Sequence, residues 1–115
     1  MKRLILLTAL CLILPAAPTF AQEYDDYFDH LANLKQQGAD YYEQAIAASD
    51  AGDAERTCQL LITAGGKYAA GRSEAIDDLD DMDGHASGED IAAMKDALKF
   101  FQEGEATIAE LMAGC

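Results

Sequence analysis

The sequence predicts an all-α protein, folded as an up-down-up antiparallel bundle of three helices. Apolar and small residues recur at intervals of three and four through three long segments, a spacing that keeps them on one helical face. The chain has no valine and no tryptophan but much alanine, so it offers little material for a sheet. Only short breaks separate the three segments, and short connections favour antiparallel packing of neighbouring helices.

The first helix is predicted from about residue 24 to residue 48. It should end at Ala51-Gly52, because glycine suits the position just past a helix end. Asp53 is then well placed to cap the next helix. The apolar or small positions of this segment are Tyr24, Tyr27, Phe28, Leu31, Leu34, Gly38, Tyr41, Tyr42, Ala45 and Ala48.

The second helix is predicted from Ala54 to about Met82. Gly65, Gly66 and Gly71 lie within it, and each costs about 1 kcal/mol relative to alanine in a helix interior. Either the helix is kinked at Gly65/Gly66, or the glycines let a neighbouring helix approach closely. The expected apolar stripe comprises Cys58, Leu61, Tyr68, Ala75, Ile76 and Leu79.

The third helix should begin after Ser87. A serine followed by Glu89 and Asp90 resembles a capping box, in which side chains bond the free N–H groups of the first helical turn. Gly104 interrupts an otherwise clean stripe made of Ile91, Met94, Leu98, Phe101, Ile108, Leu111 and Cys115.

Residues 1–21 have the features of a secretory signal peptide. Lys2 and Arg3 precede an apolar run over residues 4–14, and the run is followed by a small-x-small cleavage motif that ends at Ala21. We therefore expect one small acidic helical domain over residues 22–115, in the periplasm or secreted.

Two other interpretations of this leader are less favoured. A membrane anchor needs about 20 apolar residues, and this run is about half that length before Pro15. A lipoprotein would attach lipid at Cys11, but Leu10 stands where lipid-attachment signals, in the motif this stretch resembles, need a small residue. Cys11 should therefore be removed with the signal.

Cys58 and Cys115 are then the only cysteines left, and they are predicted to form an intramolecular disulfide. With the second turn centred near His85, Cys58 lies 27 positions before it and Cys115 lies 30 after it. In an antiparallel pair the two residues are almost level, and an exported protein meets an oxidising environment. The alternative is that Cys115 bonds a second chain and makes a covalent dimer.

The charge limits the class of partner. Without the leader, the chain keeps all 21 acidic residues and six of its eight basic residues, a formal charge of −15. Nucleic acid is therefore not expected as a partner, because each phosphate contact would meet net repulsion. A basic protein or peptide remains compatible, and so does a divalent cation. The alternative is that the acidity only keeps an exported monomer soluble.

The acidic turn between the second and third helices resembles a calcium-binding EF-hand loop. Aligned on Gly84 as the sixth position, four oxygen-bearing residues fall at the third, fifth, ninth and twelfth positions. The first position is Leu79, so one ligand of the EF-hand pattern is missing. The implied ligands of a low-affinity Ca²⁺ site are Asp81, Asp83, Ser87 and Asp90.

Four tyrosines in the first segment are candidates for an interface. Tyrosine combines an apolar ring with a polar tip and is favoured at binding surfaces, although a place at the core boundary is the commoner outcome. The candidates are Tyr24, Tyr27, Tyr41 and Tyr42.

No pattern indicates catalysis. The chain has no Cys-x-x-Cys, no Gly-x-Ser-x-Gly and no phosphate-binding glycine loop, and a thin bundle seldom encloses a desolvated acid/base pair. The leading hypothesis is a non-enzymatic exported interaction protein that binds a basic partner and needs no cofactor. The alternatives are low-affinity Ca²⁺ binding and a structural role in the cell envelope.

Overall fold

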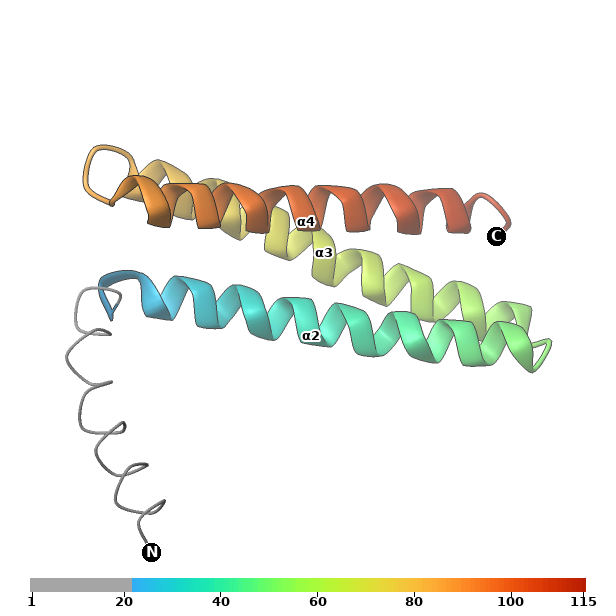
Figure 1. The fold of residues 1–115 in the computed structure, drawn as a ribbon. Helices are drawn as coiled ribbons and strands as arrows, with labels where there is room; N and C mark the ends of the chain where they lie inside the picture. The colour runs from blue at the N-terminus through green and yellow to red at the C-terminus, as the bar shows by residue number, and fades with distance from the viewer. Residues whose placement is uncertain (1–21) are drawn as a thin grey trace, which may run out of the picture.

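The structure, a computed structural model, describes residues 22–115, so the predicted signal peptide lies outside the described residues. They form three helices: α2 (Gln22–Asp50), α3 (Ala54–Met82) and α4 (Gly88–Met112). Figure 1 shows that the chain runs along α2, returns along α3 and runs forward again along α4. The predicted up-down-up three-helix bundle is confirmed.

Both turns follow the chemistry expected from the sequence. Gly52 and Gly84 adopt φ of +78°, a left-handed conformation that favours glycine, and each reverses the chain just after a helix. The Asp53 side chain accepts a 3.1 Å hydrogen bond from the Arg56 N–H at the start of α3. Ser87 caps α4 in the same way, accepting from the Asp90 N–H at 3.2 Å.

The glycines of α3 give close packing against α4. A Cβ on Gly71 would lie 2.3 Å from the Phe101 ring, and one on Gly65 would lie 3.1 Å from the Ile108 side chain. The helix is uninterrupted over Gly65 and Gly66, and the close approach of α4 holds at Gly65 and Gly71, whereas a Cβ on Gly66 would meet nothing within 4 Å. Phe101 is 1% exposed as a result and anchors the core.

Two large apolar residues of the predicted stripes lie outside the core, and the disulfide-bonded Cys115 is exposed as well. Ile76 of α3 is 44% exposed and Leu111 of α4 is 46% exposed, so these two expectations were wrong. Leu60, Ala64 and Met82 are buried instead. A single stripe at three-four spacing describes one buried face, whereas α3 packs against two helices and buries a wider face.

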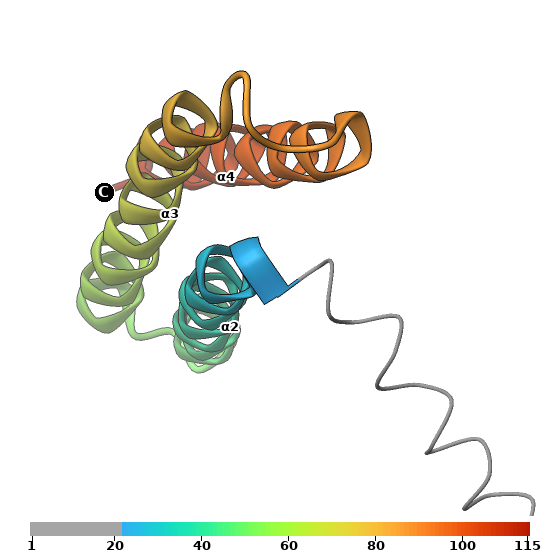
Figure 2. The same cartoon turned by 90° about the vertical axis from the view of Figure 1, so that its left-hand side faces the viewer.

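The bundle is open between its first and last helices. Both α2 and α4 pack extensively on α3, but they meet each other at only a few points. Figure 2, in which the molecule is turned by 90°, shows α2 and α4 diverging on one side of α3. The central helix α3 is therefore the only one of these three that packs extensively on both others.

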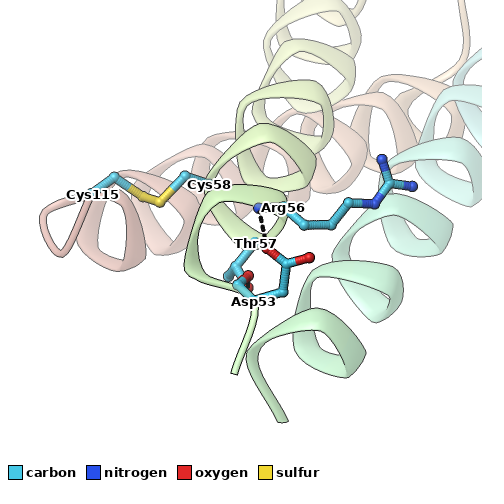
Figure 3. The surroundings of a disulfide bond; sticks show 5 residues. All are labelled: Asp53, Arg56, Thr57, Cys58 and Cys115. Carbon is cyan, nitrogen blue, oxygen red and sulfur yellow. Dashed lines mark hydrogen bonds between the residues drawn. A yellow bond between two sulfur atoms is a disulfide. The ribbon is translucent and has the colours of Figure 1, made fainter. Parts of the chain in front are cut away.

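Cys58 and Cys115 lie at disulfide-bonding distance, with their Cα atoms 5.9 Å apart. Figure 3 shows the bond joining the start of α3 to the chain end, beside the Asp53 cap. The two cysteines therefore lie at the same height along the antiparallel pair α3 and α4, as predicted. Across residues 22–115, no helix has the length and apolar character that a bilayer span requires.

Candidate functional site

The open side of the bundle carries a concave surface, which we call the α2–α4 groove. It consists of two hollows of about 290 and 250 Å³ that share Phe100. One wall belongs to α2 and the other to α4, and Tyr68 of α3 lies beneath them. The residues around the two hollows are Phe28, Leu31, Ala32, Lys35, Tyr42, Tyr68, Asp96, Ala97, Phe100, Phe101, Glu103, Gly104, Thr107 and Ile108.

Aromatic rings form the centre of the groove. The Tyr68 ring lies 5.9 Å from the Phe100 ring and 6.3 Å from the Phe101 ring, measured between centroids. A Cβ on Gly104 would lie 3.0 Å from Tyr68, so the glycine lets this ring fit beneath α4. Phe100 is the most accessible of the three rings, at 37% exposed.

Lys35 spans the groove between its two walls. Its ammonium lies 4.4 Å from the centroid of the Phe100 ring, within the range of a cation–π interaction. A cation on α2 is thus held over an aromatic ring on α4. This contact shows that the groove can hold a cation against its aromatic centre.

The candidate tyrosines occupy different environments. Tyr42 lines the groove, and Tyr41 is half-buried beside the core. Tyr24 is buried at 7% exposed. Tyr27 donates a hydrogen bond to the Asp81 carboxylate, and this bond raises the pKa of Tyr27 to about 12. Only Tyr42 of the four therefore faces a concave surface, while Tyr27 joins α2 to α3.

The four candidate Ca²⁺ ligands lie in different environments around the second turn. Asp81 accepts from Tyr27, and Ser87 caps α4 through the Asp90 N–H. Asp83 follows the last residue of α3 and is exposed. Within residues 22–115, no group of three acidic, histidine or cysteine side chains is arranged to hold a metal ion. The helix α3 continues through the acidic run to Met82.

One acidic side chain of α3 is buried, a feature that the sequence did not indicate. Asp78 is 7% exposed, and its Oδ2 has no hydrogen-bond partner among the described residues. Burial, reinforced by the nearby Glu74 carboxylate, raises the pKa of Asp78 from 3.8 to about 6. His30 of α2, whose Nε2 lies 3.8 Å from Glu74, partly opposes that shift.

The chemistry of the groove suits binding of an apolar surface. Its lining is mostly aromatic and aliphatic, with Lys35, Asp96 and Glu103 as its charged members. The sequence contains the signal for this surface, a second and weaker stripe on α2 that includes Phe28, Ala32 and Tyr42. The single apolar face predicted for the first helix includes Phe28 and Tyr42 and leaves Ala32 out, because alanine and tyrosine are compatible with both burial and exposure.

Comparison of the chain with known protein families, with characterised proteins and with solved structures found no match.

Proposed function

We propose that this protein is an exported, non-enzymatic interaction protein that binds a basic protein or peptide. The observation that carries the proposal is the excess of carboxylates without a cationic partner. Among the described residues, ion pairs involve only three carboxylates, and these belong to Glu74, Glu103 and Glu105. The 21 acidic residues therefore leave a strong negative field, which attracts a cationic partner and repels phosphate-rich ones.

Export belongs to the same proposal. The basic and apolar leader over residues 1–21 and the bonded pair Cys58–Cys115 both suit an oxidising compartment, the periplasm or the extracellular space. Expression of the full chain should yield a mature protein that begins at Gln22, with both cysteines protected from alkylation. Amino-terminal sequencing of the exported protein tests this, and a retained leader would contradict it.

The binding test is a calorimetric titration of the exported, processed protein with a lysine-rich peptide. We expect binding that weakens steeply as salt rises, because exposed charges are screened beyond about 8 Å at physiological ionic strength. A glutamate-rich peptide of the same length is the control and should not bind. Failure of the lysine-rich peptide to bind at low salt would contradict the proposal.

This function needs no bound metal. Weak Ca²⁺ binding by Asp81, Asp83, Ser87 and Asp90 is the competing proposal, and in it the Ser87 hydroxyl, which already accepts the Asp90 N–H, would use its second lone pair for the cation. A Ca²⁺ titration followed by calorimetry and thermal unfolding separates the two. Heat and a raised unfolding temperature that Asp83→Asn abolishes would favour the cation site instead.

A further inference from the structure

Acidic side chains line the outer edge of the α2–α4 groove on α4. Seven residues are almost two helical turns, so positions seven apart lie on the same side of a helix. Four acidic residues of α4 follow this spacing, and the side chains of all four are exposed: Glu89, Asp96, Glu103 and Glu110. Asp96 and Glu103 lie at the edges of the two hollows, which places this acidic row along the α4 rim.

The α2 rim repeats the pattern. Beside the groove-lining positions of α2, the residues at seven-residue spacing are again polar, exposed and mostly acidic: Asp29, Gln36, Glu43 and Asp50. The groove thus has a negatively charged edge on each side. Lys35, held over Phe100, lies between them.

Apolar residues continue between these rims beyond the two hollows. On α2, the positions that follow the three-four spacing of the groove are Phe28, Ala32, Lys35, Ala39, Tyr42 and Ile46. On α4 they are Ala93, Ala97, Phe100, Gly104, Thr107 and Leu111. Three of the large apolar side chains that remain exposed belong to these two rows: Ile46, Phe100 and Leu111, at 46%, 37% and 46%.

We propose that the groove receives one amphipathic α-helix of a partner, which packs an apolar stripe between α2 and α4 and places lysine or arginine on both flanks. This inference rests on the proposed function and specifies its binding site. In coiled coils, the residues flanking an apolar seam choose the partner by charge, and rims that are acidic on both sides choose a basic helix.

The dimensions fit a helix of about five turns. The α2 row spans residues 28–46, a length of about 27 Å at 1.5 Å per residue. A helix added there would contact α2 and α4 together and complete a four-helix arrangement, whose core the three present helices leave open. The small residues Ala32 and Ala97 leave room for its side chains.

A second copy of this chain is a poorer occupant. Each mature copy has a formal charge of −15, and pairing through the groove would bring acidic rims together. Like charges held face to face oppose association. A cationic helix instead replaces this repulsion with attraction on both flanks.

The first experiment compares three synthetic peptides of about 18 residues by calorimetry, using the exported, processed protein. One peptide segregates leucine on a helical face flanked by lysine, the second has the same composition in scrambled order, and the third has glutamate at the lysine positions. We expect the segregated lysine peptide to bind at least about tenfold more tightly than the scrambled one, and the glutamate peptide not to bind.

The second experiment tests where the peptide binds. It compares two double variants that change the net charge of the protein by the same amount. Asp96→Lys/Glu103→Lys reverses the α4 rim, whereas Asp80→Lys/Asp83→Lys reverses exposed acids that border a different hollow, between α3 and α4. We expect the rim variant to lose about tenfold in affinity for the segregated lysine peptide and the other to lose about twofold. Unfolding temperatures of both variants check that the fold is intact.

The outcomes separate this inference from the proposed function. Equal losses in the two double variants would overturn the groove while leaving general binding of basic peptides in place. Absence of binding by every lysine peptide would overturn both. A dimer of the protein alone, detected by sedimentation and dissociated by Phe100→Asp, would make a second copy the occupant and overturn the proposal.

Discussion

At Gly71, the ring of Phe101 occupies the space that any side chain would need. An added Cβ would lie 2.3 to 2.5 Å from three ring atoms, too close for contact without a shift of the ring or of a helix. The glycine therefore fixes the distance between α3 and α4 at the centre of the bundle. Because Phe101 adjoins Phe100 and Tyr68, it also fixes the centre of the groove.

Gly71→Ala is accordingly expected to lower the free energy of unfolding by roughly 1–3 kcal/mol, the usual cost of overpacking a core. Gly66→Ala is the matched control, since a Cβ there meets nothing within 4 Å. The control should be neutral or gain up to about 1 kcal/mol from helix propensity. Urea denaturation of both variants measures the difference, and equal stability would contradict the packing described for Phe101.

Asp78 makes stability depend on pH in an unusual direction. Its pKa is 3.8 for an ordinary aspartate and about 6 in the folded chain, so the folded state binds the proton more tightly than the unfolded state. The stability that this carboxyl contributes is present below about pH 4 and is lost as pH rises through about 6. Burial near Glu74, Asp77 and Asp81 of α3 is the cause, with His30 of α2 acting against it.

Asp78→Asn removes this charge while keeping the shape of the side chain. At neutral pH the variant is expected to be more stable than the parent by about 2 kcal/mol, and the gain should vanish near pH 4. Chemical denaturation across this pH range measures it. Asp80→Asn, an exposed neighbour, is the control for the change in net charge. A gain that is the same at every pH would exclude titration of Asp78 as its source.

At the scale of the elements, the disulfide ties the start of α3 to the end of the chain. Its partners are 57 positions apart, and closing a loop of that length is worth about 4 kcal/mol in the chain-entropy model. The core here is small and rich in alanine, so this contribution is a large part of the net stability of a domain of this size.

Cys58→Ser/Cys115→Ser is expected to lower the free energy of unfolding by about 4 kcal/mol while keeping the helical content at low temperature. Urea denaturation followed by circular dichroism measures the loss. On a non-reducing gel the parent protein should migrate as a single chain. A dimer band that disappears with reductant would instead support the alternative pairing through Cys115.

The helices and their boundaries could be predicted because local signals agreed. Asp53 caps α3 and Ser87 caps α4, as the sequence predicts. The turns at Gly52 and Gly84 lie where the three-four spacing of apolar residues breaks. The burial of Asp78 could not be predicted, because an aspartate in an acidic run is ordinarily solvated. The exposure of Ile76 and Leu111 depends on which faces of α3 and α4 the neighbouring helices cover, which spacing within one helix does not encode.

At the scale of the whole molecule, local sequence patterns could not predict the open side of the bundle. Three amphipathic segments with short connections predict a bundle, but they do not say whether the outer helices close on each other. Here they meet at few points, and aromatic side chains of α4 and α2 line the space between them. That opening turns a small acidic domain into a candidate receptor for a helix.

The most direct test of this account is an NMR titration of the isotope-labelled, processed protein with the segregated lysine peptide. We expect amide shifts concentrated on the groove positions of α2 and α4, including those of Lys35 and Phe100, because the peptide displaces their cation–π contact. The amides around Ile62, an exposed apolar side chain of α3 away from the groove lining, should move little. Shifts spread evenly over the acidic surface, or concentrated away from α2 and α4, would contradict it.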